Sequence, residues 1–427
     1  MNIGIIPARL NSTRLSNKIL KDINSLPMIV RVAKQVEQST MLDEVIVAVD
    51  DAEVYNIVNS YGINTIMTST NHKTGTDRIA EIAEKFNSND IIINIQGDEP
   101  LIGSQLIDDF ILLFDDRNIK MATIASTHLS VNELNDKNVV KVCIDKNMYA
   151  ETFSRDVLSD EMISKLGGLY KHLGIYGFEQ STLLKYTSLP QSDTERLLSL
   201  EQVRALENNI KIKVLITDYS AVSVDTKNDL KRVRQIIKKK EKQSEYDRHI
   251  GYYKQLYKGH YNSDLTENAT LMIAKILDSV FSKEDAKTLL DYGSGRGIQY
   301  TDKKIHEKWG IQNVRCYDPA IEKYAIKPDK TENFDAIVCI DVMEHIPERS
   351  VDDILQDIFE YKSNLVFFSI STIPAHAKLP DGSNAHCTTK PAEWWLKKLK
   401  AFKREQPQIK ILLKVETSSC PSAKRVE

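Results

Sequence analysis

Three cationic side chains lie in one polar loop, directly after the first apolar segment of the chain. The stretch IGIIPARLNSTRLSNKIL, residues 3–20, carries Arg9, Arg14 and Lys18. An arginine guanidinium binds two oxygens of one phosphate group, whereas a lysine ammonium acts as a mobile point charge. The loop therefore indicates a polyphosphate site. Taken alone, these residues fit a solvated surface loop equally well.

Two carboxylates could complete such a site by holding magnesium. Asp98 follows an apolar segment in IINIQGDEPLI, residues 92–102, and Asp225 ends the short apolar stretch AVSVDT, residues 221–226. Magnesium prefers carboxylate and phosphate oxygens, and phosphoryl transfer uses it to neutralise charge. For Asp225 the alternative is an N-cap of a helix over residues 227–236, and spacing alone favours that cap.

The segments between these residues alternate between two patterns. Ile- and Val-rich runs at residues 3–7, 44–49 and 91–96 predict strands, and amphipathic runs at 27–38, 52–61 and 76–86 predict helices. Such alternation predicts a parallel sheet with helices on both faces. Ligands of these sheets lie at the carboxyl ends of the strands, where the cationic loop and Asp98 would meet.

Five motifs in order resemble one family over about residues 1–240. They are IIPARLNSTRLSNK, HKTGTDRIAE, IQGDEP, KHLGIYGF and LEQVRAL followed by VDT. Together they are similar to the CMP-Kdo synthetases, or 3-deoxy-manno-octulosonate (Kdo) cytidylyltransferases. The resemblance implies a Rossmann-like α/β nucleotidyltransferase fold, a magnesium-dependent reaction of CTP with an eight-carbon acidic sugar, and a homodimer.

The resemblance also implies a role for each matching residue. Asp98 and Asp225 would hold magnesium, and Lys18 would stabilise the leaving pyrophosphate. The residues implied for the nucleotide are Arg9, Arg14, Lys18, Arg78 and Gln96, and those implied for the sugar are Gln96, Lys171, His172, Tyr176 and Glu201. His172 could act as a general base, but a hydrogen bond to the sugar is the favoured interpretation.

Three positions depart from the family pattern. Asn17 stands where the family has glycine, Lys171 where it has arginine, and Leu198 where an acidic residue is common. Asparagine reaches a positive φ less readily than glycine does. Loss of a guanidinium fork weakens the case for a sugar carboxylate at Lys171. Another acidic sugar, a nonulosonate or an amino-octulosonate, is therefore the alternative substrate.

The second half of the chain opens with a glycine-rich loop after a strand-like segment. TLLDYGSGRGIQY, residues 288–300, carries Asp291 and a GxGxG loop, and the later strand-like segments end at Asp318 and Asp341. One acidic strand end is usually a cap, but three behind a glycine loop indicate a ligand site. The spacing is not the GxGxxG of dinucleotide-binding proteins.

This half, over about residues 265–415, resembles the class I S-adenosylmethionine-dependent methyltransferases. The resemblance assigns Asp291, Gly293, Gly295 and Gly297 to the methionine end of the cofactor, Asp318 to its ribose, and Asp341 to its adenine side or the edge of the active site. The methyl acceptor would be a sugar or a glycan. His345, His376 and His386 are candidate bases, although a core or surface histidine is the favoured interpretation of each.

Length and composition bound these interpretations. A chain of 427 residues predicts two or three domains. The strand–helix patterns and the two resemblances together imply two α/β, Rossmann-like, three-layer domains, residues 1–245 and 246–427. The basic run at residues 231–242 favours a solvated helix end before a linker over a nucleic-acid or membrane surface. A net charge of −3, five scattered cysteines and no long apolar run predict a cytoplasmic bacterial protein that neither coats nucleic acid nor inserts into membranes.

The predicted function is therefore a bifunctional enzyme of bacterial surface-polysaccharide synthesis. Its first domain would activate Kdo or a related acidic sugar as the CMP ester, and its second would methylate an acceptor. The alternative is a cytidylyltransferase for a different acidic sugar, with a second domain that only binds the cofactor or docks a partner.

Overall fold

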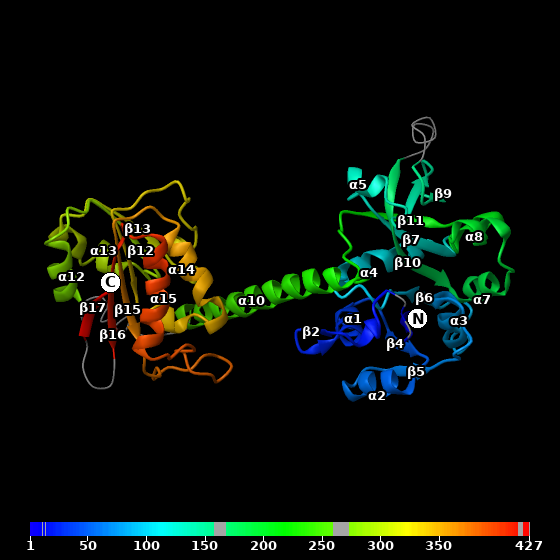
Figure 1. The fold of residues 1–427 in the computed structure, drawn as a ribbon, viewed down its shortest axis with the longest axis horizontal. Helices are drawn as coiled ribbons and strands as arrows, with labels where there is room; N and C mark the ends of the chain where they lie inside the picture. The colour runs from blue at the N-terminus through cyan, green and yellow to red at the C-terminus, as the bar shows by residue number, and fades with distance from the viewer. Residues whose placement is uncertain (11, 13, 158–167, 259–272, 417–421, 427) are drawn as a thin grey trace. The chain divides into compact units, whose positions relative to one another are not determined.

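A computed structural model describes residues 1–10, 12, 14–157, 168–258, 273–416 and 422–426 (Figure 1). Contacts between residues divide the chain into an N-terminal unit, Met1–Lys238, and a C-terminal unit, Lys239–Glu427, and each is described by itself. The boundary expected at residue 245 falls inside helix α10 (Lys227–Lys258). The basic run is therefore continuous helix and not a helix end before a linker. None of the described helices has the length and apolarity that a bilayer span requires.

The N-terminal unit is built on one mixed sheet. Its strand order is β11 (Lys213–Thr217), β7 (Met121–Ser126), β10 (Leu169–Glu179), β6 (Ile91–Asn94), β1 (Asn2–Ala8), β4 (Glu44–Val49) and β5 (Thr65–Met67), with β8 (Lys141–Ile144) and β9 (Ala150–Ser154) joined through β10. β1 pairs in parallel with β4 and β6, as the alternating pattern predicts. β10 runs antiparallel to both β6 and β7, so the expectation of an all-parallel sheet is wrong at this strand.

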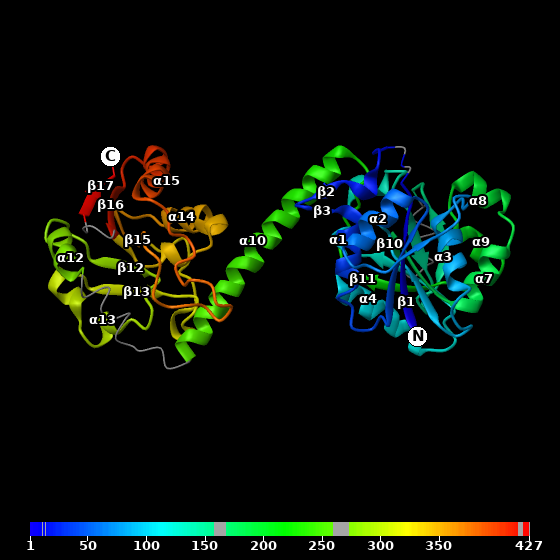
Figure 2. The same ribbon diagram turned by 90° about the horizontal axis from the view of Figure 1, so that it is seen from below.

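Helices cover both faces of this sheet (Figure 2). Alternate residues of β1 point to opposite faces: Ile6 packs in one apolar cluster with Ile29 of α1, and Ile5 packs in the other with Ile79 of α3. One face carries α1 (Met28–Val36), α2 (Ala52–Ser60) and α4 (Ser104–Ile111), and the other carries α3 (Gly75–Ala83), α7 (Gln180–Ser188) and α9 (Gln202–Glu207). The three-layer α/β fold expected for this unit is confirmed.

Short elements complete the N-terminal unit. They are η1 (Lys18–Leu20), β2 (Asp22–Ile23), β3 (Leu26–Pro27), η2 (Leu112–Asp115), α5 (Val131–Leu134) and α8 (Asp193–Leu198). The first turns of α10 also belong here, because Leu230, Val233 and Ile237 pack against Leu15 and Val224. This packing holds the start of α10 beside the cationic loop.

The C-terminal unit has a second sheet, parallel except at its edge. Its order is β13 (Asn313–Tyr317), β12 (Thr288–Tyr292), β14 (Ala336–Ile340), β15 (Leu365–Ser371), β16 (Lys410–Glu416) and β17 (Ser422–Arg425), and β17 is antiparallel to β16. The chain moves from β12 outward to β13 and then returns to the other side of β12 at β14. Such a reversal opens a crevice at the carboxyl ends of the strands.

Helices pack on both faces of this sheet too. Leu290 lies in one apolar cluster with Leu355 of α14, and Leu289 lies in the other with Leu277 of α12. Besides the end of α10, the helices of this unit are α12 (Ala274–Phe281), α13 (Ile298–Thr301), η3 (Ile305–Trp309), η4 (Glu322–Tyr324), η5 (Met343–His345), η6 (Glu348–Ser350), α14 (Val351–Phe359) and α15 (Ala392–Glu405). The unit is a three-layer α/β arrangement.

Gly293 should tolerate no side chain. Its φ is +89°, and an added Cβ would lie 2.2 Å from Val342 Cγ2. Gly293→Ala therefore adds a steric clash to backbone strain, and we expect a loss of about 2–4 kcal/mol of unfolding free energy. All three tryptophans lie in the C-terminal unit, so tryptophan fluorescence during urea unfolding of the full chain reports this unit. Gly310→Ala is the control, since Gly310 has φ +70° but no atom near its Cβ position. Equal losses for both variants would contradict the clash.

Candidate functional sites

The cationic loop begins where β1 ends and closes at η1. Asn17, at the turn into η1, has φ 51° and ψ 43°, so it takes the left-handed conformation although it is not a glycine. The backbone N–H of Lys18 donates to Ser12 Oγ at 3.3 Å, which ties the loop across itself. Asn11 and Thr13 of the same loop lie outside the described residues.

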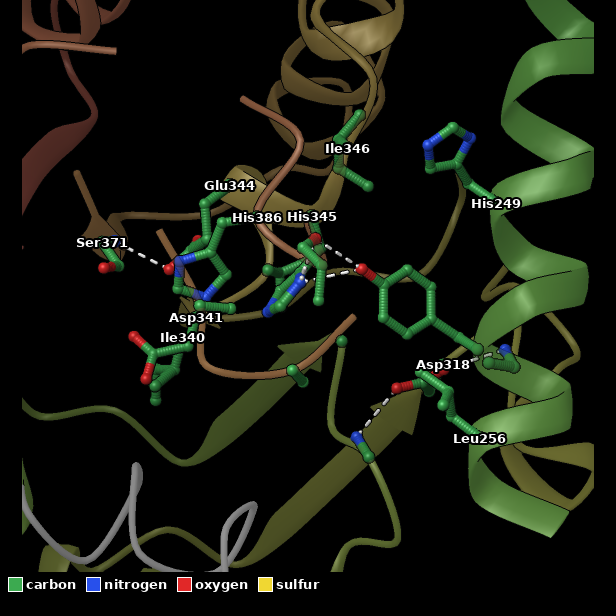
Figure 3. A pocket seen from close by; sticks show the side chains of 18 of the residues that line it. His249, Leu256, Asp318, Ile340, Asp341, Glu344, His345, Ile346, Ser371 and His386 are labelled. Carbon is green, nitrogen blue, oxygen red and sulfur yellow. Dashed lines mark hydrogen bonds between the residues drawn. The ribbon is translucent and has the colours of Figure 1, made fainter. Parts of the chain in front are cut away.

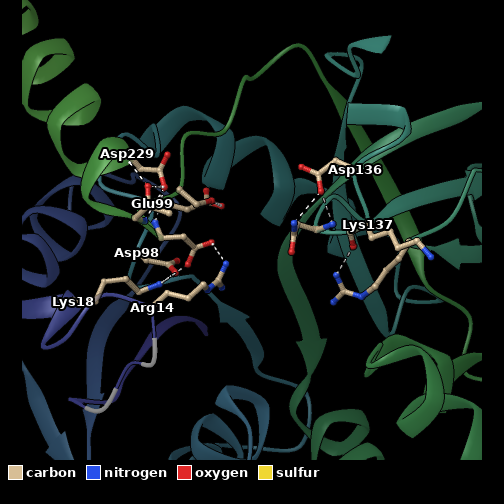
Figure 4. Close-up of polar contacts among 12 residues, drawn as sticks. Arg14, Lys18, Asp98, Glu99, Asp136, Lys137 and Asp229 are labelled. Atoms are coloured by element: carbon tan, nitrogen blue, oxygen red, sulfur yellow. Dashed lines mark hydrogen bonds and ion pairs between the residues drawn. The ribbon is translucent and has the colours of Figure 1, made fainter. Parts of the chain in front are cut away.

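Asp98 and Asp225 converge on one ammonium group. Lys18 Nζ lies 2.5 Å from Asp98 Oδ2 and 3.0 Å from Asp225 Oδ1, and Arg14 Nη1 lies 3.0 Å from Asp225 Oδ2. Figure 4 shows the side chains of Arg14, Lys18 and Asp98 gathered in one place. The two acidic segments are joined directly, because Val224 N donates to Asp98 O at 2.9 Å.

The helix cap that spacing favoured for Asp225 belongs to its neighbour. Thr226 Oγ1 accepts from Asp229 N at 3.2 Å, and Asp229 Oδ2 accepts from Thr226 N at 2.8 Å. This reciprocal pair is a capping box at the start of α10. The prediction of Asp225 as the cap is wrong, and its carboxylate is left to meet Lys18 and Arg14.

The two carboxylates affect the pKa of Lys18. Burial lowers the pKa of Lys18, but the charges and hydrogen bonds of Asp98 and Asp225 outweigh it and hold that pKa above its usual value. Among the described residues, no group of three or more histidine, cysteine, aspartate and glutamate side chains is arranged to hold a metal ion. Two carboxylates still suit magnesium, which usually takes one or two from protein and completes its shell with phosphate and water.

The two remaining nucleotide candidates differ in what they contact. Arg9 is exposed and makes no hydrogen bond or ion pair with any described residue. Arg78 is only 3% exposed and donates to Asp50 Oδ2 at 2.7 Å and to Thr68 Oγ1 at 2.5 Å. Asp50 in turn accepts from Leu10 N at 3.4 Å. Arg78 therefore supports the start of the cationic loop through Asp50.

The candidate sugar-binding residues on β10, and Gln96 just after β6, lie among polar and aromatic side chains. Gln96 Nε2 donates to Gly174 O at 2.8 Å, and the Tyr176 ring lies 5.3 Å from the His172 ring. Lys171 Nζ is 2.6 Å from Glu133 Oε1. Burial opposes ionisation of Glu133, but hydrogen bonds from Lys171 and Ser130 outweigh it and lower the pKa of Glu133 to about 2. The Lys171 ammonium is thus already paired.

Glu201 faces the same region from the start of α9. Its Oε2 accepts from Thr76 Oγ1 at 2.9 Å, and burial raises its pKa. Its charge also contributes to the raised pKa of Tyr176, after burial.

Two acidic residues that the sequence interpretation missed belong to this region. Glu99 is 3% exposed, and burial followed by the charge of Asp98 raises its pKa to about 8. Its Oε1 accepts from Ser223 Oγ at 3.3 Å. Its place directly after Asp98 in QGDEP was the available signal. For Glu133 the sequence gives no such signal, because its partner Lys171 is 38 residues away.

Comparisons with known proteins cover the N-terminal unit. Residues 3–212 match the family model described as cytidylyltransferase. A 3-deoxy-manno-octulosonate cytidylyltransferase of Fusobacterium nucleatum subsp. nucleatum is 46% identical over 237 residues, which are 55% of this chain and 96% of the relative. The N-terminal half of the chain belongs to the 3-deoxy-manno-octulosonate cytidylyltransferase family.

Two further relatives also match only about half of this chain. The cytidylyltransferase of Thermodesulfovibrio yellowstonii is 42% identical over 243 residues, 54% of this chain and 95% of the relative. A solved structure of CMP:2-keto-3-deoxy-manno-octonic acid synthetase complexed with CTP has a TM-score of 0.53 and 34% identity, covering 56% of this chain and 99% of that chain. These relatives extend over one unit's length and identify no methyltransferase fold in the other.

The C-terminal unit, beyond the cytidylyltransferase half, encloses a cavity of about 830 Å³. It lies at the carboxyl ends of β12, β13 and β14, where the strand order reverses. Figure 3 shows α10 as one wall, with His249 and Leu256, and Glu344 and Ser371 on the far side. Tyr253 of α10 donates from its hydroxyl to Ala385 O at 2.8 Å and so anchors this wall.

The glycine loop after β12 closes one end of the cavity. Gly293, Gly295 and Gly297 all have positive φ, and the added Cβ of Gly297, like that of Gly293, would clash within the unit. Gly295 instead borders the cavity, and its N–H donates to Asp318 Oδ2 at 2.9 Å. Burial raises the pKa of Asp291 to about 6, and Gln299 Nε2 donates to its Oδ2 at 3.1 Å. The structure thus brings the loop, Asp291 and Asp318 together.

A second polar group lines the other end. Asp341, with φ 52°, accepts from Ser369 Oγ at 3.0 Å. The His345 and His386 rings are 4.7 Å apart, and their Nδ1 atoms lie 3.0 Å and 2.6 Å from the Ala385 and Ile373 carbonyl oxygens. Burial lowers the pKa of His345 to about 4. His376 also lines the cavity.

His172 should remain neutral throughout the physiological pH range. Burial lowers its pKa to about 3, and Thr123 fixes its tautomer. The Thr123 hydroxyl donates to Ile175 O at 2.7 Å, so the contact of 2.9 Å with His172 Nε2 needs an N–H on that nitrogen. We expect ¹H–¹⁵N NMR spectra of the full chain to show a neutral Nε2–H imidazole from pH 8 to pH 5. His172→Gln assigns the signal, and a titration midpoint between pH 6 and 7 would contradict the burial argument.

Proposed function

We propose that the N-terminal unit transfers CMP from CTP to the anomeric hydroxyl of Kdo or a related acidic sugar. The observation that carries this proposal is the convergence of Asp98 and Asp225 on Lys18 at the carboxyl ends of β1 and β6. In the reaction, the sugar hydroxyl oxygen forms a bond to the α-phosphorus and releases its proton to solvent, while the bond from the α-phosphorus to the oxygen of the β-phosphate breaks. Pyrophosphate then leaves with the electron pair of that bond.

The side chains divide this work between them. Asp98 and Asp225 would hold magnesium, which supplies charge neutralisation for the triphosphate. Arg9 and Arg14 bind phosphate oxygens, and Lys18 accompanies the leaving pyrophosphate. Gln96, Tyr176 and Glu201 face the sugar. His172 donates its Nε2–H to Thr123, so only Nδ1 is left to accept a hydrogen bond from the sugar, and its low pKa makes it a poor general base.

One observation favours a second candidate sugar. The Lys171 ammonium is paired with Glu133 at 2.6 Å, where the family has arginine for a carboxylate. A paired cation attracts a sugar carboxylate less strongly than a free one does. An amino-octulosonate or a nonulosonate also carries a carboxylate, so either would be the alternative substrate through contacts that its other substituents make. Pyrophosphate release with all four nucleotides and a panel of acidic sugars ranks the candidates by kcat/KM, with CTP and Kdo expected first.

Asp98→Asn removes one of the two charges that face Lys18 and would hold the metal. We expect pyrophosphate release to fall by more than about a hundredfold at saturating CTP and sugar, because the metal provides several kcal/mol of charge stabilisation. The matched control is Asp115→Asn, since Asp115 is exposed at the end of η2. Activity retained by Asp98→Asn within threefold of wild type would overturn the metal role of Asp98.

We propose further that the C-terminal unit binds S-adenosylmethionine and transfers its methyl group to a sugar or glycan. The cavity at the strand-order reversal carries this proposal, together with Gly295, Asp291 and Asp318 around it. Asp318 keeps free lone pairs for ribose hydroxyls, since each of its oxygens accepts one backbone N–H. Bound there, the cofactor supplies an already reactive methyl group, and the protein has to orient the acceptor.

Cofactor binding should stabilise the C-terminal unit alone. S-Adenosylhomocysteine at a hundredfold excess over its Kd is expected to raise the unfolding free energy of this unit by about 2.7 kcal/mol. Tryptophan fluorescence reports this transition in the full chain, and CTP is the control ligand because its proposed site has no tryptophan. No shift with either S-adenosyl compound would rule out the cofactor. Binding without methyl transfer to any glycan would favour the non-catalytic alternative.

A further inference from the structure

Three carboxyl groups meet at the end of the cavity away from the glycine loop. Asp341 follows β14, Glu416 ends β16, and Glu344 lies in η5. All three line the cavity, and we refer to them as the acidic end. They come from segments up to 75 positions apart, so the tertiary fold and not one local motif assembles them.

Glu344 has an unused acceptor atom inside the protein. The residue is 0% exposed, its Oε1 accepts from Ser371 N at 2.7 Å, and its Oε2 has no hydrogen-bond partner among the described residues. Burial, and then the charge of Asp341, raises the pKa of Glu344 well above its usual value. A buried carboxyl oxygen is nearly always paired, so a donor from a ligand is the simplest partner for it.

The cations nearby do not supply that partner. Lys414 and His386 act on Asp341 by charge, but neither hydrogen-bonds to Glu344. His386 Nδ1 is taken by Ile373 O and His345 Nδ1 by Ala385 O. Among the described residues, therefore, none donates a hydrogen bond to Glu344 Oε2.

We propose that the acidic end binds the protonated amino group of the methyl acceptor, which would make the acceptor an amino sugar or a similar polar amine. This inference rests on the proposed methyl-transfer function, whose acceptor it specifies. An ammonium group offers three N–H donors and a positive charge to the three carboxyls. A hydroxyl group offers one donor and brings no positive charge to favour ionisation of carboxyl groups whose pKa burial has raised. The number of carboxyls therefore favours an amine over an alcohol at this position.

Binding of simple sugars to the full chain tests the proposal. Saturation-transfer NMR titrations with glucosamine, glucose and N-acetylglucosamine would be run with S-adenosylhomocysteine present, at slightly acidic pH where the amine is protonated. We expect glucosamine to bind about tenfold more tightly than the two neutral sugars. Equal affinities for all three sugars would overturn the proposal.

Matched variants locate the effect. Glu344→Gln should remove most of the glucosamine preference, and Glu405→Gln should keep it, because Glu405 is exposed at the end of α15. Asp341→Asn is a second test in case Glu344→Gln does not fold, since asparagine accepts the left-handed backbone of Asp341. Tryptophan fluorescence checks folding of each variant. A preference unchanged in both Glu344→Gln and Asp341→Asn would overturn the site.

The same titrations separate the two proposals. S-Adenosylhomocysteine binding without any amine preference would overturn the amine site and leave the methyl-donor proposal standing. An amine preference that depends on Glu344, without S-adenosylhomocysteine binding, would support the amine site and overturn the methyl donor.

Discussion

The N-terminal site depends on one ammonium group held between two carboxylates. Asp98 and Asp225 carry like charges and would repel one another at this separation, and Lys18 removes that repulsion. The fold brings them together by ending β6 beside β1 and by bonding Val224 N to Asp98 O. A metal ion that arrives there replaces one cation with another. In the proposed reaction, magnesium held by Asp98 and Asp225 would take over this compensation, and Lys18 would be free to meet the phosphates.

Much of this arrangement follows from local sequence. The alternating apolar runs predict β1, β4 and β6 with their helices, and they place Arg9 and Asp98 at one edge of the sheet. The position of Asp225 could not be obtained in this way, because an aspartate before a helix has the same local pattern whether it caps the helix or not. Only Thr226 and Asp229, by capping α10 themselves, leave Asp225 available.

Long-range pairing explains the other differences between expectation and structure. β10 enters the sheet antiparallel between β6 and β7, and no local pattern distinguishes this from a parallel strand. Glu133 and Lys171 lie on separate elements, and their ion pair changes what Lys171 offers a sugar. The environment of Glu344 also depends on long-range packing, here of η5 against β15. This packing brings Glu344 Oε1 to Ser371 N and leaves Oε2 without a hydrogen-bond partner among the described residues. Sequence motifs therefore predict which residues lie together in a site, but only the tertiary structure shows which of them already have hydrogen-bond or ion-pair partners.

Each unit has its site at the carboxyl ends of parallel strands, but the two sites differ in how their carboxyl groups are compensated. In the N-terminal unit, Lys18 and Arg14 compensate Asp98 and Asp225 within the protein, which suits a ligand that brings negative charge together with its own metal. In the C-terminal unit, one oxygen of the acidic end has no hydrogen-bond partner in the described part of the chain, which suits a ligand that brings donors and positive charge. Because buried charge is costly unless it is paired, the groups that each site leaves unpaired indicate the chemistry of the missing partner. The proposed functions agree with this difference, because they put a polyphosphate with its metal at one site and a protonated amine at the other.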